Sequence, residues 1–331
     1  MKLNATQYGI PPELVRSLDL IGCKTATDIL FSTPADLYRR LPPGTLTYSD
    51  FQRHIRHITA ASSASGTSGN DLLRAEESNS TIQSPISTGN GVLDALLDGF
   101  RGAHTLEVSG DKGSGKTGFA LLVVLRHLSN FPESFALWID ATGDFSAERA
   151  TQLLDSCAGS QAECETVLDR LQVSLAFDLD SAYEALDSAR VALESSTAIQ
   201  YIVIDTITNL LSPLLSATSS QGHATMTHFM RQLRELAHEF GITILVLNNA
   251  TRSTPNNPHT VFESEKKPAL GPSFPFLTDA TLWLWCPPGS HFSEDDESSE
   301  ETVHVAEILR SKTTQSKVWC TFRSKNGMIL A

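Results

Sequence analysis

Glycine, lysine and threonine are closely spaced in the stretch GDKGSGKT, residues 110–117. It fits the pattern G-x-x-x-x-G-K-[S/T], in which glycines let the backbone wrap around phosphate groups and backbone N–H groups supply positive potential. In such a loop Lys116 would bridge the β and γ phosphate oxygens, and the Thr117 hydroxyl would ligate Mg²⁺. The pattern therefore predicts a site for a nucleoside triphosphate. Its expected binding residues are Gly110, Asp111, Lys112, Gly113, Ser114, Gly115, Lys116, Thr117 and Gly118.

Magnesium in this kind of site needs a second protein ligand, which should stand at the end of another buried strand. The apolar run YIVIDT ends at Asp205. An aspartate at a strand end is often only a cap, but beside residues 110–117 it predicts the second metal ligand. A further run, ITILVLNN, ends in Asn248 and Asn249. Their amides could contact the γ phosphate, or they could simply begin a loop.

The elements around the glycine-rich loop are those that this chemistry requires. Residues 105–109 predict a strand before the loop, and a helix is expected from Lys116 to about Leu128 after it. Further amphipathic helices are expected near 146–157, 181–195 and 222–240. Their alternation with apolar runs predicts an α/β fold, with a mostly parallel sheet covered by helices on both faces. The last three runs, DATLWLWC, TVHVAEILRS and SKVWCTFRS, predict an antiparallel extension.

Two segments precede this core, which is expected over residues 84–331. Residues 1–59 predict a small all-helical domain, because helix-start patterns such as STPAD occur between their apolar positions. Residues 60–83 are rich in Ser, Gly and Asn and predict a flexible linker. The apolar pair Leu72 and Leu73 in that linker could dock on another surface or could be incidental.

The chain of 331 residues is acidic, with a formal net charge of −13. Residues 1–60 carry seven Lys and Arg against five Asp and Glu, a balance of +2, which leaves −15 for the rest. Six carboxylates crowd into SEDDESSEE, residues 293–301, which we expect to be a solvated loop. Because nonspecific binding of nucleic acid depends on basic residues, such a chain should contact DNA only locally.

Cysteine spacing and hydropathy exclude other classes of protein. The five cysteines are widely spaced and form no Cys-x-x-Cys pair, which indicates a reducing intracellular compartment and no zinc site. The N-terminus lacks the apolar core of a signal peptide, and no apolar run approaches ~18 residues. Neither secretion nor contact with a membrane is expected.

Taken in order, these features resemble the RecA family of recombinases, and most of all the D-type paralogues of the eukaryotic recombinase. The likeness covers nearly the whole chain. It includes GIPPELVRSLDLIGCKTATDIL near the N-terminus, STGNGVLDALLDG before the core, SPLL after the Asp205 strand, and KPALGPSF after a polar loop. The resemblance implies a RecA-like P-loop ATPase core behind a helical N-terminal domain. It also implies ATP as the nucleotide, a nuclear location, and a role in repairing DNA breaks by homologous recombination.

Partners also follow from the resemblance. D-type members are adaptors in a heteromeric complex of recombinase paralogues, which helps the main recombinase load on single-stranded DNA. Their N-terminal unit and linker dock on one paralogue, and the ATPase core contacts another. The resemblance therefore makes Leu72 and Leu73 candidates for a docking segment.

The sequence departs from active recombinases at the catalytic positions. In those enzymes the strand that corresponds to FALWID is followed by a Glu that aligns the attacking water. Thr142 takes the place of that Glu in this sequence. A Thr hydroxyl can hold a water but cannot take its proton. Asp140 and Asp144 are nearby, but each would need a different geometry. Asn249 replaces the longer Gln usual at the sensor position, so the catalytic candidates, Lys116 and Asn249, would work without an evident base.

The loops expected to face DNA are poor in basic residues. LLSPLLSATSSQG after Asp205 has no Lys or Arg. The later loop, 250–272, has three basic residues, of which Lys266 and Lys267 follow two glutamates. Few phosphate contacts predict weak, salt-sensitive binding of single-stranded DNA.

Two functions remain from different classes. The chain could be an adaptor in which ATP and Mg²⁺ are mainly structural, or an active DNA-dependent ATPase that forms filaments and exchanges strands. Thr142 and the uncharged loop favour the adaptor. A RecA-like ATPase outside recombination is a third reading, against which the helical N-terminal domain argues.

Overall fold

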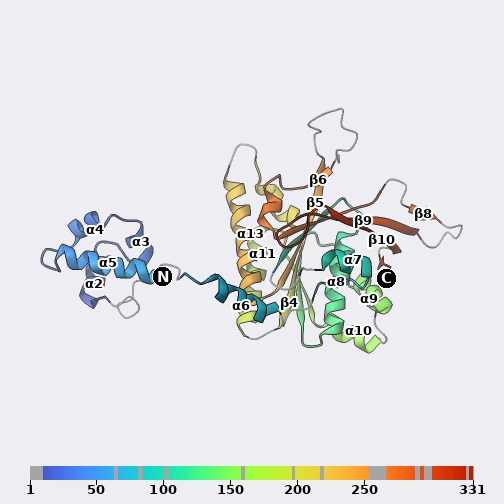
Figure 1. Cartoon of the computed structure of the whole chain (residues 1–331), viewed down its shortest axis with the longest axis horizontal. Coiled ribbons are helices and arrows are strands. Elements are labelled where there is room, and N and C mark those ends of the chain that lie inside the picture. Colours follow the sequence, from blue (N-terminus) through green and yellow to red (C-terminus); the bar gives the residue numbers. More distant parts are fainter. Residues whose placement is uncertain are drawn as a thin grey trace. The chain divides into compact units, whose positions relative to one another are not determined.

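The computed structural model describes residues 10–62, 66–80, 85–98, 100, 104–157, 161–195, 198–216, 220–252, 266–287, 291–293, 300–325 and 328–330. The chain divides into two compact units, Met1–Ala75 and Glu76–Ala331 (Figure 1). Most of the acidic stretch 293–301 and of the polar loop 250–272 lies outside the described residues.

The first unit is helical, as predicted. Its helices are α2 (Pro12–Leu20), α3 (Ala26–Leu30), α4 (Pro34–Arg40) and α5 (Tyr48–Ser62). Capping side chains start two of them: Thr25 and Asp28 form a reciprocal capping box at α3, and the Thr33 side chain accepts from the Asp36 N–H at α4. Buried apolar side chains from all four helices form one core: Leu14, Leu18, Ile29, Leu37, Phe51, Ile55 and Ile58.

The segment predicted as a flexible linker requires correction. Residues 60–62 complete α5, and a separate helix, α6, spans Gly69–Ser80. The Ser68 hydroxyl accepts from the Asp71 N–H at 3.1 Å and donates to its carboxylate at 2.6 Å, so a side-chain cap begins this helix within a polar sequence. Leu72 and Leu73 on α6 are 54% and 52% exposed.

The second unit is built on one sheet of eleven strands. The strands are β1 (Thr105–Gly110), β2 (Phe135–Asp140), β3 (Leu171–Leu175), β4 (Ile199–Asp205), β5 (Thr243–Arg252), β6 (Lys266–Pro268), β7 (Ala280–Trp285), β8 (His291–Ser293), β9 (Glu300–Ser311), β10 (Val318–Lys325) and β11 (Met328–Ile329). The main path has the order β11-β10-β9-β7-β1-β5-β4-β2-β3, with β6 beside β5 and β8 beside β9.

The pairing confirms a mostly parallel sheet with an antiparallel extension. Strands β7, β1, β5, β4, β2 and β3 are mutually parallel, whereas β9, β10 and β11 run antiparallel. One detail differs from the prediction, because β7, expected in the extension, pairs in parallel with β1. The edge strand β3 was not predicted, since its five residues, LQVSL, are half exposed and lack a continuous apolar run.

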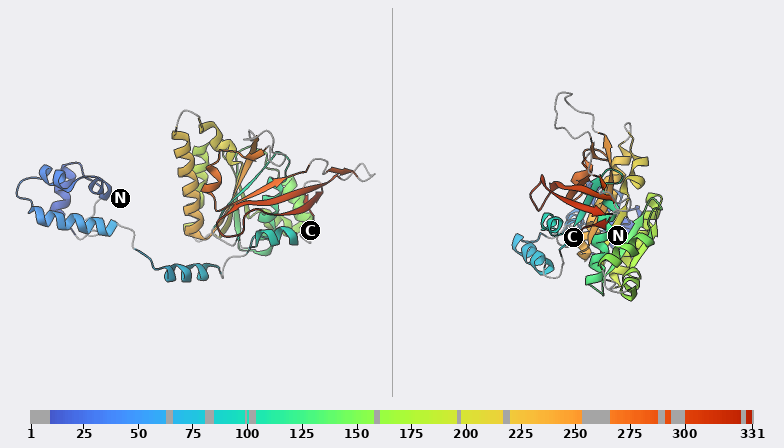
Figure 2. Two further views of the ribbon diagram at one scale, coloured as in Figure 1. Left: turned by 45° about the horizontal axis from the view of Figure 1, so that its top comes forward. Right: turned by 90° about the vertical axis from the view of Figure 1, so that its right-hand side faces the viewer.

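Helices cover both faces of the sheet (Figures 1 and 2). Four contribute to the core on one face: α7 (Gly91–Leu97), α8 (Lys116–Asn130), α9 (Ala147–Cys157) and α10 (Gln161–Leu168). Three contribute to the core on the other face: α11 (Leu179–Glu194), α12 (Ile207–Leu211) and α13 (Gln221–Phe240). Short 3-10 turns, η1 (Ser212–Leu214) and η2 (Phe274–Leu277), complete the unit. No helix among the described residues has the length and apolar character to cross a membrane.

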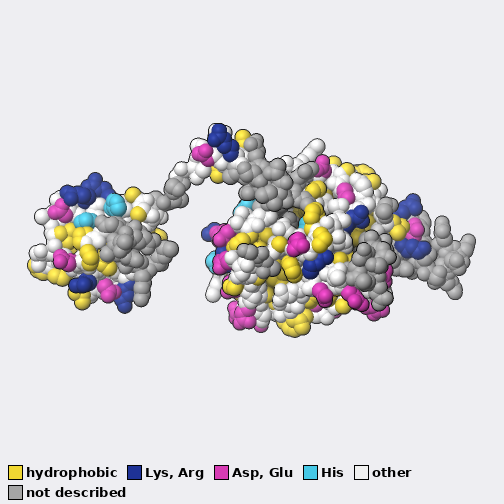
Figure 3. Space-filling view, turned by 90° about the horizontal axis from the view of Figure 1, so that it is seen from below, with side chains coloured by type: hydrophobic (Ala, Val, Ile, Leu, Met, Phe, Trp, Pro, Cys, Tyr) yellow, Lys and Arg dark blue, Asp and Glu magenta, His cyan; other side chains and the backbone are white. Residues whose placement is uncertain are grey.

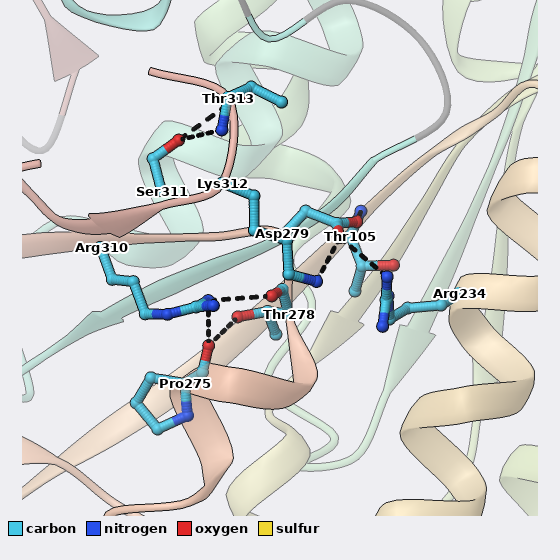
Figure 4. Close-up of polar contacts among 9 residues, drawn as sticks. All are labelled: Thr105, Arg234, Pro275, Thr278, Asp279, Arg310, Ser311, Lys312 and Thr313. Carbon is cyan, nitrogen blue, oxygen red and sulfur yellow. Dashed lines mark hydrogen bonds and ion pairs between the residues drawn. The ribbon is translucent and has the colours of Figure 1, made fainter. Parts of the chain in front are cut away.

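A charged cluster ties the amino end of β1 to three other elements (Figure 4). The carboxylate of Asp279 accepts from the Thr105 N–H at 2.9 Å, and it pairs with Lys312 at 2.8 Å and with Arg234 at 3.3 Å. Nearby, Arg310 donates to the carbonyls of Pro275 and Thr278. The cluster fixes the junction of β1, β7, β9 and α13 at the end of β1 remote from the glycine-rich loop.

Candidate functional site

The glycine-rich loop joins the carboxyl end of β1 to the start of α8, as predicted. Gly113 and Gly115 have φ of 81° and 96°, in the left-handed region that glycine adopts without strain. A Cβ added at Gly110 would lie 2.2 Å from the Leu284 carbonyl oxygen. These three positions therefore favour glycine over any residue with a Cβ, which lets the loop keep its wrapped shape.

Helix α8 begins at this loop without a capping side chain, because its N-cap is Gly115. Side chains cap α7, where Asn90 accepts from the first turn, and α11, where Asp178 accepts from the Ser181 N–H, whereas α12 and α13 resemble α8 in having no side-chain cap. The first N–H groups of a helix need an acceptor, and a bound phosphate supplies one. The cradle around α8 therefore fits a polyphosphate group.

The Lys116 ammonium is folded back onto the loop. It donates to the carbonyl oxygens of Gly110 at 2.8 Å and Asp111 at 2.7 Å, and the side chain is buried. Burial lowers the pKa of Lys116, while the carboxylates of Asp205 and Asp111 oppose that shift. The Lys116 ammonium thus lies beside the cradle. A bound phosphate would offer it a fully charged partner in place of the two carbonyl oxygens.

The two predicted metal ligands contact each other, since the Thr117 hydroxyl donates to the Asp205 carboxylate at 3.0 Å. Burial raises the pKa of Asp205 to about 6; Asp140 and Asp144 add to the shift, whereas Thr117 and Lys116 oppose it. A divalent cation would relieve this crowding of negative charge. Mg²⁺ commonly binds through one or two protein ligands plus phosphate oxygens and waters, so Thr117 and Asp205 suffice on the protein side.

A cavity of about 530 Å³ brings most of the predicted site together. Its lining includes Asp111, Lys112, Gly113, Lys116, Thr117, Thr142, Asp144, Arg149, Asp205 and Asn249. Of the remaining predicted residues, Gly115 and Gly118 line a neighbouring cavity, while the Ser114 side chain is buried behind the loop. Gly110 ends β1 directly opposite Asn249 of β5.

The neighbouring cavity, of about 260 Å³, is closed by residues that the sequence did not single out. They include Arg149, Thr302, His304, Phe322 and Ser324. The His304 ring stacks on Phe322 with centroids 5.0 Å apart, and its Nε2 lies 2.6 Å from the Ser324 hydroxyl. The alternation of β9 and β10 predicts that His304, Phe322 and Ser324 share a face, but no local pattern relates that face to a loop so far away in the chain.

The turn IDATGDF leaves little freedom to either Asp140 or Thr142. The Asp140 carboxylate accepts from the N–H groups of Thr142, Gly143 and Phe145 and from the Thr142 hydroxyl, each at 2.9 Å. Burial opposes the charge on Asp140, but these hydrogen bonds outweigh it and hold its pKa below the usual range. Asp140 is therefore a poor general base, because it holds the turn and binds a proton weakly.

Thr142 reaches the larger cavity but is itself part of the turn. Its hydroxyl donates to Asp140 and accepts from the Asp144 N–H at 3.2 Å. The exposed Asp144 is the second carboxylate of this turn and, unlike Asp140, lines the cavity. Thr142, the residue expected at the place of a water-aligning Glu, thus presents a hydroxyl already engaged in the turn.

Asn248 and Asn249 lie within β5, which continues to Arg252 instead of giving way to a loop, and the two side chains have different surroundings. Asn249 lines the larger cavity, whereas Asn248 is fully buried in the sheet. Asn248 donates to the Glu107 carboxylate at 2.7 Å and accepts from the Thr208 hydroxyl at 2.7 Å. Contact with a nucleotide in this cavity is therefore open to Asn249 and closed to Asn248.

Basic residues are few in the loops expected to face DNA. On the face seen in Figure 3, Lys and Arg side chains are interspersed with Asp and Glu. Lys266, one of the basic residues of the later loop, forms an ion pair with Asp111 of the phosphate loop. The described part of the loop after Asp205 has no basic residue, and that of the later loop has three, Arg252, Lys266 and Lys267, of which Lys266 is held by Asp111.

Comparison with known proteins gives a consistent result. The Rad51 family model matches residues 79–284. "DNA repair protein RAD51 homolog 4" of Bos taurus is 31% identical over 282 residues, which cover 83% of this chain and 82% of that protein. The protein of the same name from Mus musculus is 29% identical over 311 residues, 92% of this chain and 89% of that one. The crystal structure of the RadB recombinase shares the fold, with a TM-score of 0.57 and 22% identity over 74% of this chain and 98% of that chain.

Proposed function

Because the chain belongs to the Rad51 family, we propose that it acts in homologous recombination repair of DNA breaks as an adaptor that binds ATP and Mg²⁺. Such a protein would work in the nucleus, within a heteromeric complex of recombinase paralogues that assists loading of the recombinase on single-stranded DNA. The similarity to proteins named as RAD51 homologues over most of both chains supports this role.

The observation that carries the adaptor reading is the Thr142 turn. Thr142 has a hydroxyl instead of a carboxylate, and the adjacent Asp140 accepts four hydrogen bonds within the turn. Asp144 is the carboxylate of this turn that lines the cavity, but it stands two residues beyond Thr142, so a water aligned at Thr142 would lack a well-placed general base. The nearest alternative is an active DNA-dependent ATPase that forms filaments and exchanges strands, and this turn argues against it.

In the proposed site each residue has a distinct task. The N–H groups of the loop and of α8 bind the phosphates, Lys116 neutralises their charge, and Thr117 and Asp205 hold Mg²⁺. The phosphate oxygens of bound ATP would accept hydrogen bonds from the loop N–H groups and would pair with the charge of Lys116. Because ATP binds only the folded core, it stabilises that core and its interfaces by mass action.

Partner binding is proposed for two separate regions. The N-terminal unit with its linker would bind one recombinase paralogue, and the ATPase core would bind another. Leu72 and Leu73 support the first contact, since both aliphatic side chains are more than half exposed on α6. Direct contact with single-stranded DNA would be weak, because Lys266 is engaged by Asp111 and the loop after Asp205 has no basic residue.

Fragment capture tests the proposed partners. Residues 1–83 and 84–331 are expected to retain different recombinase paralogues from a nuclear extract, identified by mass spectrometry. In the full chain, Leu72→Ser with Leu73→Ser should remove the partner of the first fragment only. Val191→Ser is a matched control, because Val191 is an equally exposed aliphatic residue on α11. Retention of no paralogue by either fragment would contradict the adaptor role.

An ATPase assay separates the two functions. The adaptor reading predicts nucleotide binding that Lys116→Ala abolishes, and turnover that single-stranded DNA hardly stimulates. Strong stimulation of hydrolysis by DNA in the isolated protein would favour the alternative.

A further inference from the structure

Glu107 is a buried acid in the middle of β1, three residues before the phosphate loop. Its side chain is fully buried, and burial raises its pKa, whereas hydrogen bonds from Asn248, Thr281 and Ser109 act in the opposite direction. Asn248 Nδ2 lies 2.7 Å and the Ser109 hydroxyl 2.9 Å from one carboxylate oxygen, and the Thr281 hydroxyl lies 2.7 Å from the other. Three neutral donors thus converge on one buried carboxylate.

One of these donors continues as a chain of hydrogen bonds. Asn248 Oδ1 accepts from the Thr208 hydroxyl at 2.7 Å, and that hydroxyl accepts from the Asn249 N–H at 2.9 Å. Every donor therefore points in one direction, from Asn249 through Thr208 and Asn248 to Glu107. Hydrogen bonds arranged in this way polarise one another and fix the orientation of each group. We call this chain the Glu107 relay.

The relay connects the elements that surround the larger cavity. Glu107 belongs to β1, which leads into the phosphate loop, and Thr208 belongs to α12, three residues after the proposed metal ligand Asp205. Asn248 also donates to the Ala269 carbonyl at 3.2 Å, and the Ala269 N–H donates to the Asn249 carbonyl at 2.8 Å. Both the N–H and the carbonyl of Asn249 are thus held, and its side chain lines the cavity.

We propose that the Glu107 relay positions Asn249 against the third phosphate of the bound nucleotide and so sets the preference for a triphosphate over a diphosphate. This inference rests on the proposed nucleotide site. Glu107, Asn248 and Thr208 are positioning residues, because they act through Asn249. Asn has a short side chain, so its amide can reach a phosphate only if the backbone is held in place. The Thr208 hydroxyl holds this backbone, because it accepts from the Asn249 N–H and is itself oriented by its hydrogen bond to Asn248.

A purely structural role makes a different prediction. If the hydrogen bonds only satisfied buried polar groups, breaking one would lower the stability of the protein without changing which nucleotide it prefers. The two explanations therefore differ in the ratio of two affinities.

Thr208→Val in the full-length protein is the decisive variant, because valine keeps the shape and removes the hydroxyl at the centre of the relay. Thr281→Val is the matched control, since it removes a hydrogen bond to the same carboxylate on the β7 side, away from Asn249. Dissociation constants for ATPγS and for ADP would be measured with Mg²⁺ by calorimetry, together with the melting temperature of each protein.

If the relay positions Asn249, Thr208→Val should bind ATPγS about tenfold more weakly and ADP with nearly unchanged affinity. The ratio of the ADP to the ATPγS dissociation constant should then fall about tenfold. Thr281→Val should melt earlier but keep the ratio. Asn249→Ala should reproduce the loss, and adding Thr208→Val to it should cause no further loss. Thr208→Ser, which restores the hydroxyl, should restore the ratio and guards against a variant that folds poorly.

An unchanged ratio in Thr208→Val, or an equal loss in Thr281→Val, would refute the positioning role and leave the proposed nucleotide site intact. Failure of the unsubstituted protein to bind either nucleotide would instead refute the proposed function, and the relay would fall with it.

Discussion

The Thr117 hydroxyl donates a hydrogen bond of 3.0 Å to the Asp205 carboxylate, although 88 positions separate the two residues in the chain. Thr117 lies in the first turn of α8 and Asp205 ends β4, so their contact depends on the order of strands in the sheet. Two oxygen ligands are therefore already adjacent, and a metal ion would need little rearrangement to reach both.

Asp205→Asn should separate metal binding from folding. We expect the gain in ATP affinity on adding Mg²⁺ to fall at least about tenfold, because the amide lacks the carboxylate charge. The free protein should become more stable at pH 7. The pKa of Asp205 is about 6 in the folded protein and 3.8 in the unfolded chain. Ionisation of Asp205 therefore lowers the free energy of unfolding progressively as the pH rises from 3.8 through 6. The asparagine removes a penalty on the order of 3 kcal/mol.

Titrations of ATP with and without Mg²⁺, and urea unfolding at pH 7, measure both effects. Lys116→Ala is the control that should lose nucleotide under both conditions, since it removes a phosphate contact. A lower free energy of unfolding for Asp205→Asn would contradict the reading of a strained, buried carboxylate.

Thr142→Glu tests whether a missing base limits hydrolysis. The new carboxylate would extend from the wall of the cavity that Lys116 and Asp205 also line, so steady-state ATP turnover should rise at least about tenfold. Thr142→Gln has the same length without a base and should show no rise. Equal turnover in both variants and in the unsubstituted protein would mean that another group is limiting.

The phosphate loop was predictable because its constraints are local. The positive φ of Gly113 and Gly115 and the start of α8 depend on a few neighbouring residues. The α6 helix also had a local signal, the Ser68 cap, but the surrounding Ser and Gly residues indicated a linker.

Other parts of the site depend on tertiary register alone. Arg149 lies on α9 and His304 on β9, and only the sheet order brings both to the phosphate loop. The Glu107 relay likewise joins residues from three separate elements. Neither spacing nor composition predicts which buried polar residues meet across a sheet.

Asp279→Ala should destabilise the second unit by about 3 kcal/mol, because it leaves Lys312, Arg234 and the Thr105 N–H without their shared partner (Figure 4). Burial alone would raise the pKa of Asp279, but Lys312, the Thr105 N–H and Arg234 outweigh it and lower the pKa. Chemical unfolding at pH 7 would measure the loss. Glu239→Ala is the control: its pair with Arg190 is exposed, so the loss should stay below about 1 kcal/mol. Equal losses in the free energy of unfolding would show that the Asp279 cluster stabilises the fold no more than an exposed ion pair does.

His127 should make the folded protein sensitive to mild acid. Burial lowers the pKa of His127 to about 4, from 6.5 for a histidine in water, and the nearby Arg170 adds a smaller effect in the same direction. The folded pKa is the depressed one, so the stabilisation is complete above pH 6.5 and is lost progressively as pH falls toward 4, where only the unfolded chain readily gains the proton. The side chain packs against Phe131 and Tyr201, which explains the poor solvation of a charged ring.

The free energy of unfolding should therefore decrease by about 1–2 kcal/mol between pH 6.5 and 4 through this group, a value reduced for its partial exposure. Urea titrations across this range should show a flatter profile for His127→Gln than for the unsubstituted protein. His228→Gln is the matched control, because His228 is an exposed residue on α13. If His228→Gln flattened the profile as much as His127→Gln, burial of His127 could not be the source of the pH dependence.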